Sequence, residues 1–191
     1  MERTDKRGKI FQAAMELIAE RGFHGAPMAM IAERAGVAAG TIYRYFDNKD
    51  ILITELYSEL EEELRSALEE GYSVAKPIRE RFLHLGIAIL RYFIAHPLYF
   101  RYIEQYHNSP YGVSLRRDMI MSKIGKHNIF KDLFEQGIEQ QVMKDLPITV
   151  IFALAFGPLL VLLKDHIHGF VILDDGLIRQ VIDSCWDAIR R

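Results

Sequence analysis

A short run of polar side chains between residues 41 and 49 holds the best candidates in this chain for binding another molecule. Hydroxyl groups and two cations occur there at close spacing: Thr41, Tyr43, Arg44, Tyr45 and Lys49. Hydroxyl and ammonium groups donate hydrogen bonds to phosphate oxygens, and the planar fork of an arginine can bind a guanine base at two points. The run therefore predicts contacts with a nucleic acid.

These side chains need a rigid support, and the surrounding sequence predicts one. An amphipathic helix over residues 27–35 is followed by Gly36, which suits the positive φ of a turn that leaves a helix. A second short helix is expected over residues 39–46, and the small side chain of Ala32 permits close contact between the two helices. Two short helices joined by a tight turn form a helix-turn-helix, whose second helix enters the DNA major groove.

The same stretch resembles the signature of the TetR family of bacterial repressors. The resemblance covers residues 9–57 and depends on three groups of residues. In chain order they are Ile31-Ala32, then Ala35-Gly36-Val37, then Gly40-Thr41-Ile42-Tyr43-Arg44-Tyr45-Phe46 followed by Lys49. A chain with this signature is expected to bind DNA as a transcription regulator.

The resemblance implies a role in DNA binding for each matching residue. The positions that hold phosphates in the family are occupied here by Thr41, Tyr43, Tyr45 and Lys49. The positions near base edges are occupied by Ala39, Gly40 and Arg44. Among the base-edge residues only Arg44 carries a donor fork, whereas a glycine at position 40 lets the helix backbone approach the DNA.

The chain departs from the family pattern at two places. Ala26 and Pro27 stand where the family usually has Thr or Ser, so a side-chain cap and a phosphate contact lack their usual residue. Ala29 and Ala39 stand where other members often carry long polar side chains that contact bases. Methyl contacts and DNA shape are therefore expected to contribute more to specificity here.

The net charge gives no global sign of nucleic-acid binding. The chain has 24 basic and 26 acidic residues and a formal net charge of -2. Its first 50 residues hold eight Lys or Arg and seven Asp or Glu, a balance of +1. Affinity for DNA must therefore come from a local group of cations. We expect Lys6 to contact DNA within a basic patch of Arg3, Lys6, Arg7 and Lys9, and the alternative is a solvated, frayed terminus.

The rest of the sequence predicts an all-α protein, because apolar residues recur at helical spacing and no segment alternates like a strand. About nine helices are expected: 4–21, 27–35, 39–46, 48–74, 78–95, a short aromatic helix after Pro97, 114–141, 147–168, and a last one capped by Asp174 or Asp175. We predict a three-helix, helix-turn-helix DNA-binding domain over residues 1–49. A helical domain for effector binding and dimerisation is predicted over residues 50–191.

Large aromatic and methionine side chains in the second domain favour a binding cavity over a catalytic site. Small-molecule pockets are mostly apolar with a few polar groups, and the family resemblance implies an effector among the middle helices. The candidate ligand-binding residues are Tyr92, Phe93, Tyr106, Met119 and Phe156. They predict a small hydrophobic or aromatic effector. Aromatic residues at helical spacing also form ordinary cores, so that interpretation stays open.

The last two helices predict a surface for a second copy of the chain. Residues 147–168 are apolar on all sides, which is more apolar surface than one monomer easily covers. The resemblance implies a homodimer through these two helices, arranged as a four-helix bundle across a two-fold axis. A two-fold symmetric dimer would bind double-stranded operator DNA with a roughly palindromic sequence.

A membrane span is the alternative interpretation of the same stretch. Leu146–Leu163 is uncharged and just reaches the length of a spanning helix. Pro147 and the pair Gly157-Pro158 argue against it, and no membrane association is expected. A single cysteine, Cys185, and the lack of an apolar signal-peptide core favour a cytoplasmic location.

Signals for an enzyme are poor. The run Asp165-His166-Ile167-His168 invites a metal site, but residues two apart on a helix do not face the same way. We expect no catalytic residue, metal or cofactor. The sequence predicts a ligand-responsive transcription regulator that acts as a homodimeric repressor. The alternatives are an activator on the same fold, and a helical small-molecule binding protein or enzyme with a vestigial helix-turn-helix.

Overall fold

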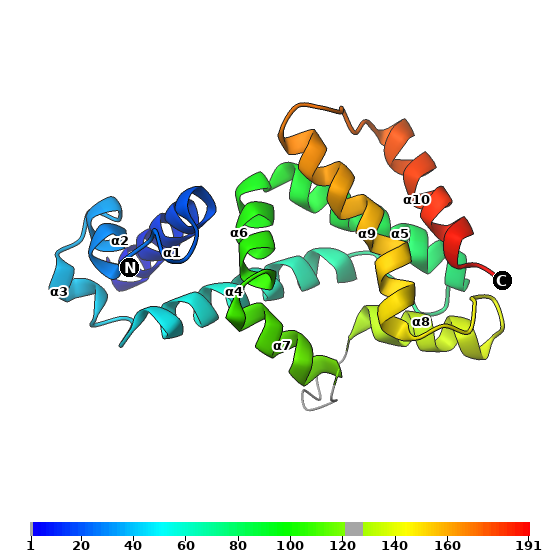
Figure 1. The fold of residues 1–191 in the computed structure, drawn as a ribbon, viewed down its shortest axis with the longest axis horizontal. Coiled ribbons are helices and arrows are strands. Elements are labelled where there is room, and N and C mark those ends of the chain that lie inside the picture. Colours follow the sequence, from blue (N-terminus) through cyan, green and yellow to red (C-terminus); the bar gives the residue numbers. More distant parts are fainter. Residues whose placement is uncertain (1, 121–127) are drawn as a thin grey trace. The chain divides into compact units, whose positions relative to one another are not determined.

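The structure, a computed structural model, describes residues 2–120 and 128–191, with side chains for residues 6–115 and 128–191. The described residues form ten α-helices and no strand (Figure 1), which confirms the predicted all-α class. In chain order the helices are α1 (Glu2–Arg21), α2 (Met28–Arg34), α3 (Ala39–Ile42), α4 (Lys49–Glu69), α5 (Ile78–Ala95), α6 (Pro97–His107), α7 (Pro110–Ile120), α8 (Ile129–Glu139), α9 (Ile148–Ile167) and α10 (Asp175–Ile189).

The count differs from the expected nine because the helix predicted over residues 114–141 is two helices, α7 and α8. Residues 121–127, between them, lie outside the described range. α8 starts afresh because the Asn128 side chain accepts hydrogen bonds from the backbone N–H groups of Phe130 at 3.0 Å and Lys131 at 3.1 Å. A side chain that satisfies the first free N–H groups of a helix is an N-cap, so the prediction of one continuous helix is wrong.

Two other helices are shorter than predicted. α3 ends at Ile42, and the chain continues in turns, with the N–H of Arg44 bonded to the carbonyl oxygen of Thr41 at 3.1 Å. α4 ends at Glu69 rather than near residue 74. Gly71 follows with a φ of 70°, a left-handed conformation that commonly ends a helix and that glycine adopts without strain.

The chain divides into two compact units, and the first contains Met1–Glu63 and His96–Ile124. In this unit α1 packs against α2 and α6, and α2 packs against α3 (Figure 1). The rings of Phe11 and Phe46 stack with centroids 5.1 Å apart, which holds the end of the helix-turn-helix on α1. The most buried side chains of this core are Ile10, Ala14, Leu17, Ile18, Ile31, Ile42, Phe46, Leu52, Ile53 and Tyr102.

The second unit contains Leu64–Ala95 and Gly125–Arg191. Here α5 packs against α8, α9 and α10, and α9 also contacts α8 and α10 (Figure 1). Gly86 permits the close approach of α5 and α10, because a Cβ atom there would lie 2.9 Å from Cγ2 of Ile182. The buried side chains of this core include Phe82, Leu85, Leu133, Phe134, Ile151, Phe156, Leu159, Leu163, Ile182 and Ile189.

The division by packing falls elsewhere than the functional boundary predicted between residues 49 and 50. α4 passes from one unit to the other between Glu63 and Leu64, and α6 and α7 belong to the unit of the helix-turn-helix. The hydroxyl of Tyr102 on α6 donates to the carbonyl oxygen of Ile53 on α4 at 2.9 Å. The predicted boundary concerns function rather than packing, and it stays a prediction.

The two C-terminal helices differ in how much of their apolar surface the chain covers by itself. On α10 the apolar side chains of Ile178, Ile182, Cys185 and Ile189 are buried. By length and composition alone α9 could cross a membrane, although Pro158 interrupts its hydrogen bonding. Several large apolar side chains of α9 remain exposed: Val150, Phe152, Leu154, Leu160 and Val161.

Candidate nucleic-acid interface

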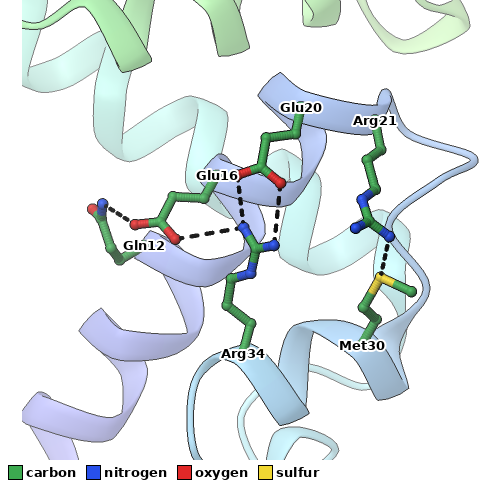
Figure 2. A network of polar contacts seen from close by, with 6 residues as sticks. All are labelled: Gln12, Glu16, Glu20, Arg21, Met30 and Arg34. Atoms are coloured by element: carbon green, nitrogen blue, oxygen red, sulfur yellow. Dashed lines mark hydrogen bonds and ion pairs between the residues drawn. The ribbon is translucent and has the colours of Figure 1, made fainter.

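A network of polar contacts holds α2 on α1 and so fixes the support of the predicted DNA contacts (Figure 2). Arg34 at the end of α2 donates two hydrogen bonds to the carboxylate of Glu20 on α1, at 2.9 and 3.1 Å. Its guanidinium also lies 3.8 Å from Glu16, which accepts a hydrogen bond from Gln12 at 2.8 Å. The hydrogen bonds from Arg34 hold the pKa of the Glu20 carboxyl below its ordinary value. Arg34 is therefore engaged within the protein.

The turn after α2 has the geometry that the sequence predicted. Gly36 has a φ of 66°, which confirms the expected positive φ. The N–H of Val37 donates to the carbonyl oxygen of Ala32 at 3.0 Å and closes the turn. Ala32 is almost fully buried, as expected for the small residue at the approach of the two helices. A side chain with a Cβ atom at position 36 would strain this backbone.

α3 buries one side and exposes the other. Ile42 is fully buried, and Phe46 beyond it is 1% exposed. Ala39 and Gly40 on α3, and Arg44 just beyond its end, are exposed. These three are the residues predicted to lie near base edges. All three are accessible, and a Cβ atom at Gly40 would meet no other group within 4 Å.

The residues predicted to hold phosphates lie around this surface in different environments. Tyr43 is 53% exposed, and Thr41 and Tyr45 are half-buried. Tyr45 packs against the core of the first unit, with its ring centroid 6.5 Å from that of Phe46. The ring of Tyr45 is therefore packed, whereas that of Tyr43 is largely in solvent.

Lys49 has a contact that sequence analysis missed. Its ammonium group donates a hydrogen bond to the carbonyl oxygen of Phe23, in the connector between α1 and α2. Partial burial lowers the pKa of the Lys49 amine, and the charge of Asp50 opposes that shift. The side chain thus ties the start of α4 to the connector. No local sequence signal marks a bond between residues 26 positions apart.

The predicted basic patch near the N-terminus is divided by the fold. Arg7 donates to Glu59 at 2.7 Å and to Glu55 at 3.1 Å, and its guanidinium lies 4.2 Å from the ring centroid of Phe11. Partial burial lowers the pKa of Arg7, but the two carboxylates raise it by more. Arg7 therefore joins α1 to α4. Lys6 is half-buried on α1 and Lys9 is exposed, while the side chain of Arg3 lies outside the described residues.

The departures from the family pattern at residues 26 and 27 have a visible result. Pro27 occupies the N-cap position of α2 and accepts no side-chain hydrogen bond from the first turn. Its fixed φ of -67° suits the start of a helix, because the ring is already set near the helical value. Ala26 is fully buried in the core. α2 therefore starts through packing and proline geometry rather than through a side-chain cap.

The five residues predicted to bind an effector are not gathered in one unit. Tyr106 belongs to the first unit, where it stacks on Tyr57 with ring centroids 3.9 Å apart. Tyr92, Phe93 and Phe156 belong to the second unit, and the last two are buried. The side chain of Met119 lies outside the described residues.

Phe156 lies at the centre of an aromatic cluster from α5, α8 and α9. Its ring centroid is 5.0 Å from that of Phe130, 5.2 Å from that of Phe152 and 5.6 Å from that of Phe82. Tight contacts of this kind are typical of a packed core. As the structure stands, Phe156 is a core residue of the second unit.

His166 contacts the backbone of the connector that follows α9. Nδ1 of His166 lies 3.3 Å from the backbone nitrogen of Leu173 and 3.1 Å from the carbonyl oxygen of Val171. These contacts fold the connector after α9 back onto the helix. In the described part of the chain no group of three or more His, Cys, Asp or Glu side chains is placed to hold a metal ion.

Family models match both parts of the chain. The model for bacterial regulatory proteins of the tetR family matches residues 10–56. A second model, for the tetracyclin repressor-like C-terminal domain, matches residues 77–190. The first range covers the helix-turn-helix described above, and the second covers more than half of the chain.

Relatives and solved structures agree with these matches. A helix-turn-helix-type transcriptional regulator of Haemophilus influenzae is 26% identical over 190 residues, covering 99% of this chain and 98% of the relative. The fatty acid metabolism regulator protein of Bacillus subtilis is 28% identical over 191 residues, covering 96% and 97%.

Among solved structures, a TetR-family transcriptional regulator from Haemophilus influenzae has a TM-score of 0.81 at 27% identity and covers 100% of both chains. A TetR-family protein from Vibrio parahaemolyticus has a TM-score of 0.77 at 34% identity, covering 97% of this chain and 99% of the other. The chain therefore belongs to the tetR family of bacterial regulatory proteins and is a helix-turn-helix transcriptional regulator.

Proposed function

We propose that this regulator is a cytoplasmic, homodimeric repressor that leaves a palindromic operator when it binds a small apolar effector. The observation that carries the proposal is the exposure of Ala39 and Gly40 on α3 and of Arg44 just after it, following a turn in which Gly36 has a positive φ. A small, accessible helix surface with one cation fits a DNA groove, because little steric bulk prevents close approach to the bases.

Each candidate residue has a distinct task in this proposal. Arg44 binds a base edge through two hydrogen bonds, and the small residues beside it allow the approach. Contacts to phosphates come from the hydroxyl and ammonium groups of Lys6, Thr41, Tyr43, Tyr45 and Lys49. Phosphate contacts fix the register of the protein on the duplex without selecting a sequence, whereas base contacts select it.

The dimer interface is proposed to form around α9. Val150, Leu154 and Val161 are exposed and share one side of the helix with Gly157, at spacings of four, three and four residues. Apolar residues at such spacing form a stripe along a helix that packs against a second helix. A Cβ atom at Gly157 would meet nothing within 4 Å in the monomer, which leaves room there for a partner helix.

The effector is proposed to bind in the second unit. Tyr92, Phe93 and Phe156 are the candidate contacts there, and all three are large and mainly apolar. Tyr106 and Met119 stay predictions. The Bacillus subtilis relative is named for the regulation of fatty acid metabolism, which favours an effector with an apolar chain.

Release from DNA follows from linkage between the two binding events. We propose that the effector binds better to a state in which the two α3 helices no longer match successive major grooves, about 34–36 Å apart. A ligand that prefers this state shifts the equilibrium toward it, and DNA must weaken effector binding by the same factor. α4 is proposed to transmit the change, because it runs without a break from the helix-turn-helix into the second unit.

A mobility-shift titration tests this function with duplexes that cover the chromosomal region around the gene. The proposal expects one or more duplexes to bind with an affinity that falls steeply as salt rises, because cations on the protein displace counterions from phosphates. A promoter fusion with and without the protein then distinguishes repression from activation. Failure to retain any duplex at low salt would overturn the proposed function.

A further inference from the structure

We infer that Arg81, with Tyr72 and Gln136, forms the site in the second unit that binds the acidic head of an amphiphilic effector. Arg81 lies in the first turn of α5, and its side chain is 2% exposed. A guanidinium group stays charged in proteins, so this is a permanent positive charge inside the second unit.

The charge has no carboxylate partner within the described part of the chain. Arg81 donates from Nε to the hydroxyl of Tyr72 at 2.9 Å and from Nη1 to Oε1 of Gln136 at 2.7 Å, and both acceptors are neutral. The tyrosine ring also faces the guanidinium, with the ring centroid 5.4 Å away. A buried charge that lacks a counter-ion is costly, because neutral dipoles replace only part of its hydration.

The other arginines of α5 show the contrast. Arg79 is exposed and bonds to Asp183 at 2.6 Å, and Arg91 is exposed and bonds to Asp175 at 2.8 Å. Carboxylates on α10 therefore pair with the arginines that water already solvates. The buried arginine, for which a counter-ion would matter most, has none among the described residues.

The groups around Arg81 that can still form hydrogen bonds are N–H and O–H donors. Tyr72 uses its oxygen to accept from Arg81, so its own O–H proton can be donated elsewhere, and the amide nitrogen of Gln136 likewise carries two N–H donors. The guanidinium supplies further N–H groups. Arg81 also stands in the first turn of a helix, where the helix dipole adds positive potential. Such a cluster is complementary to an oxyanion, a carboxylate or a phosphate group.

The surroundings of the cluster define the rest of the ligand. Tyr72 and Gln136 are half-buried, so the cluster reaches the surface through these two side chains. Phe82 follows Arg81 on α5 and contacts Phe156, one of the proposed effector residues. The inferred ligand therefore carries its oxyanion at one end of an apolar chain that extends toward these rings. The inference deepens the proposed function, since it names the chemistry of the effector, but its test requires no DNA.

The test measures ligand binding to the full-length protein by calorimetry and by the shift of its thermal unfolding midpoint. The probes are octanoate, octyl phosphate, octanol and inorganic phosphate. We expect one or both acidic amphiphiles to bind about tenfold or more tightly than octanol, because charge-assisted hydrogen bonds are lost with the alcohol. Inorganic phosphate should bind more weakly than either acidic amphiphile, and the better of the two identifies the head group.

Three variants separate a binding role from a structural one. Arg81→Gln should abolish the preference for the acidic probes over octanol. Gln136→Glu supplies a counter-ion of nearly the same shape, so it should raise the unfolding midpoint without ligand and remove the response to acidic probes. Arg79→Gln removes an exposed arginine of the same helix and should leave the response unchanged.

Three results would overturn the inference. They are equal binding of octanol and both acidic amphiphiles, binding of inorganic phosphate as tight as that of octyl phosphate, and a Gln136→Glu protein that still responds to acid. If the acidic probes bind as expected but no duplex is retained, the proposed repressor function fails and the site stands.

Discussion

At the scale of single residues, DNA recognition depends on which cations the fold leaves available. Arg34 bonds to Glu20, and Arg7 bonds to Glu55 and Glu59. Arg44, in contrast, is exposed and makes no hydrogen bond or ion pair with another described residue. We therefore propose Arg44 as the side chain beside α3 that selects a base.

Replacing Arg44 should remove sequence preference more than affinity. A bidentate contact to guanine discriminates against a wrong base by about 1–3 kcal/mol. We expect Arg44→Ala to lose roughly that much on its specific duplex and little on a scrambled one, as measured by fluorescence anisotropy. Arg44→Lys, which keeps the charge without the fork, serves as the control and should also lose preference. Equal loss of affinity on both duplexes would contradict the assignment.

Sequence alone was sufficient for the residues whose role is local. The positive φ of Gly36 follows from the chemistry of the turn, and the burial of Ala32 follows from its spacing to that turn. The contact of Lys49 with the carbonyl of Phe23 could not be predicted in this way. It depends on two segments that meet only when the chain folds, and the same holds for Arg81 and Gln136.

At the scale of elements, close contacts and ion pairs between helices hold in place the helices that carry the candidate sites. Helical periodicity predicted most helices, because each buries one apolar side. It failed between α7 and α8, where Asn128 caps a new helix although apolar spacing continues. α3 is also shorter than its pattern suggested, because the N–H groups of Arg44 and Tyr45 bond to carbonyl oxygens three residues back, as in turns.

Gly86 gives a test of helix packing in the second unit. In the Gly86→Ala protein the new methyl group would lie 2.9 Å from Ile182, so α5 and α10 must separate. We expect a loss of about 1–3 kcal/mol in unfolding free energy, measured by urea denaturation. Combining it with Ile182→Ala should cost less than the sum of the two single changes.

The matched control for that experiment is Gly8→Ala. Gly8 is exposed on α1 and a Cβ atom there meets nothing within 4 Å. Alanine is favoured over glycine inside a helix by roughly 0.5–1 kcal/mol, so this variant should be neutral or slightly stabilised. A similar loss in both variants would refute the explanation by packing.

The ion pair between α1 and α2 predicts a dependence on pH. Hydrogen bonds from Arg34 lower the pKa of Glu20 in the folded state below its ordinary 4.5. The stabilisation is therefore fully present above about pH 4.5 and is lost as the pH falls through the lower, folded-state pKa. Wild type should exceed Glu20→Gln in unfolding free energy at pH 7, and the two should converge in acid.

Arg34→Gln removes the same pair from its other side and provides the control. Its unfolding free energy should also approach that of wild type as the pH falls, because protonated Glu20 no longer attracts a cation. A difference between wild type and Glu20→Gln that stays constant from pH 7 into acid would rule out this contribution.

At the scale of the whole molecule, the proposed repressor requires two copies of the chain. The apolar side chains of α10 are largely buried within the monomer. α9, in contrast, exposes Val150, Leu154 and Val161 along one side. Periodicity could predict that α9 is apolar all round, but it could not say which side the monomer itself covers. That distinction needs the packing of α5, α8 and α10 against α9.

A charge on this surface should dissociate the dimer. Val161 is 61% exposed in the monomer and would be covered in the proposed dimer. We expect Val161→Glu to weaken the dimer by about 3 kcal/mol or more, because an unpaired charge would be buried. Sedimentation velocity measures the change. Val74→Glu, at a valine 72% exposed between α4 and α5, should leave the dimer intact, and a dimeric Val161→Glu protein would exclude this interface.

Selection of duplexes from a random library by the full-length protein tests the central claim most directly, because it requires the helix-turn-helix and the dimer together. We predict an enriched inverted repeat whose two half-sites lie about one helical turn, or a multiple of it, apart. We also predict that the Arg44→Ala protein enriches the repeat poorly or not at all. Recovery of no common sequence, or of a single unrepeated site bound by one copy of the chain, would contradict it.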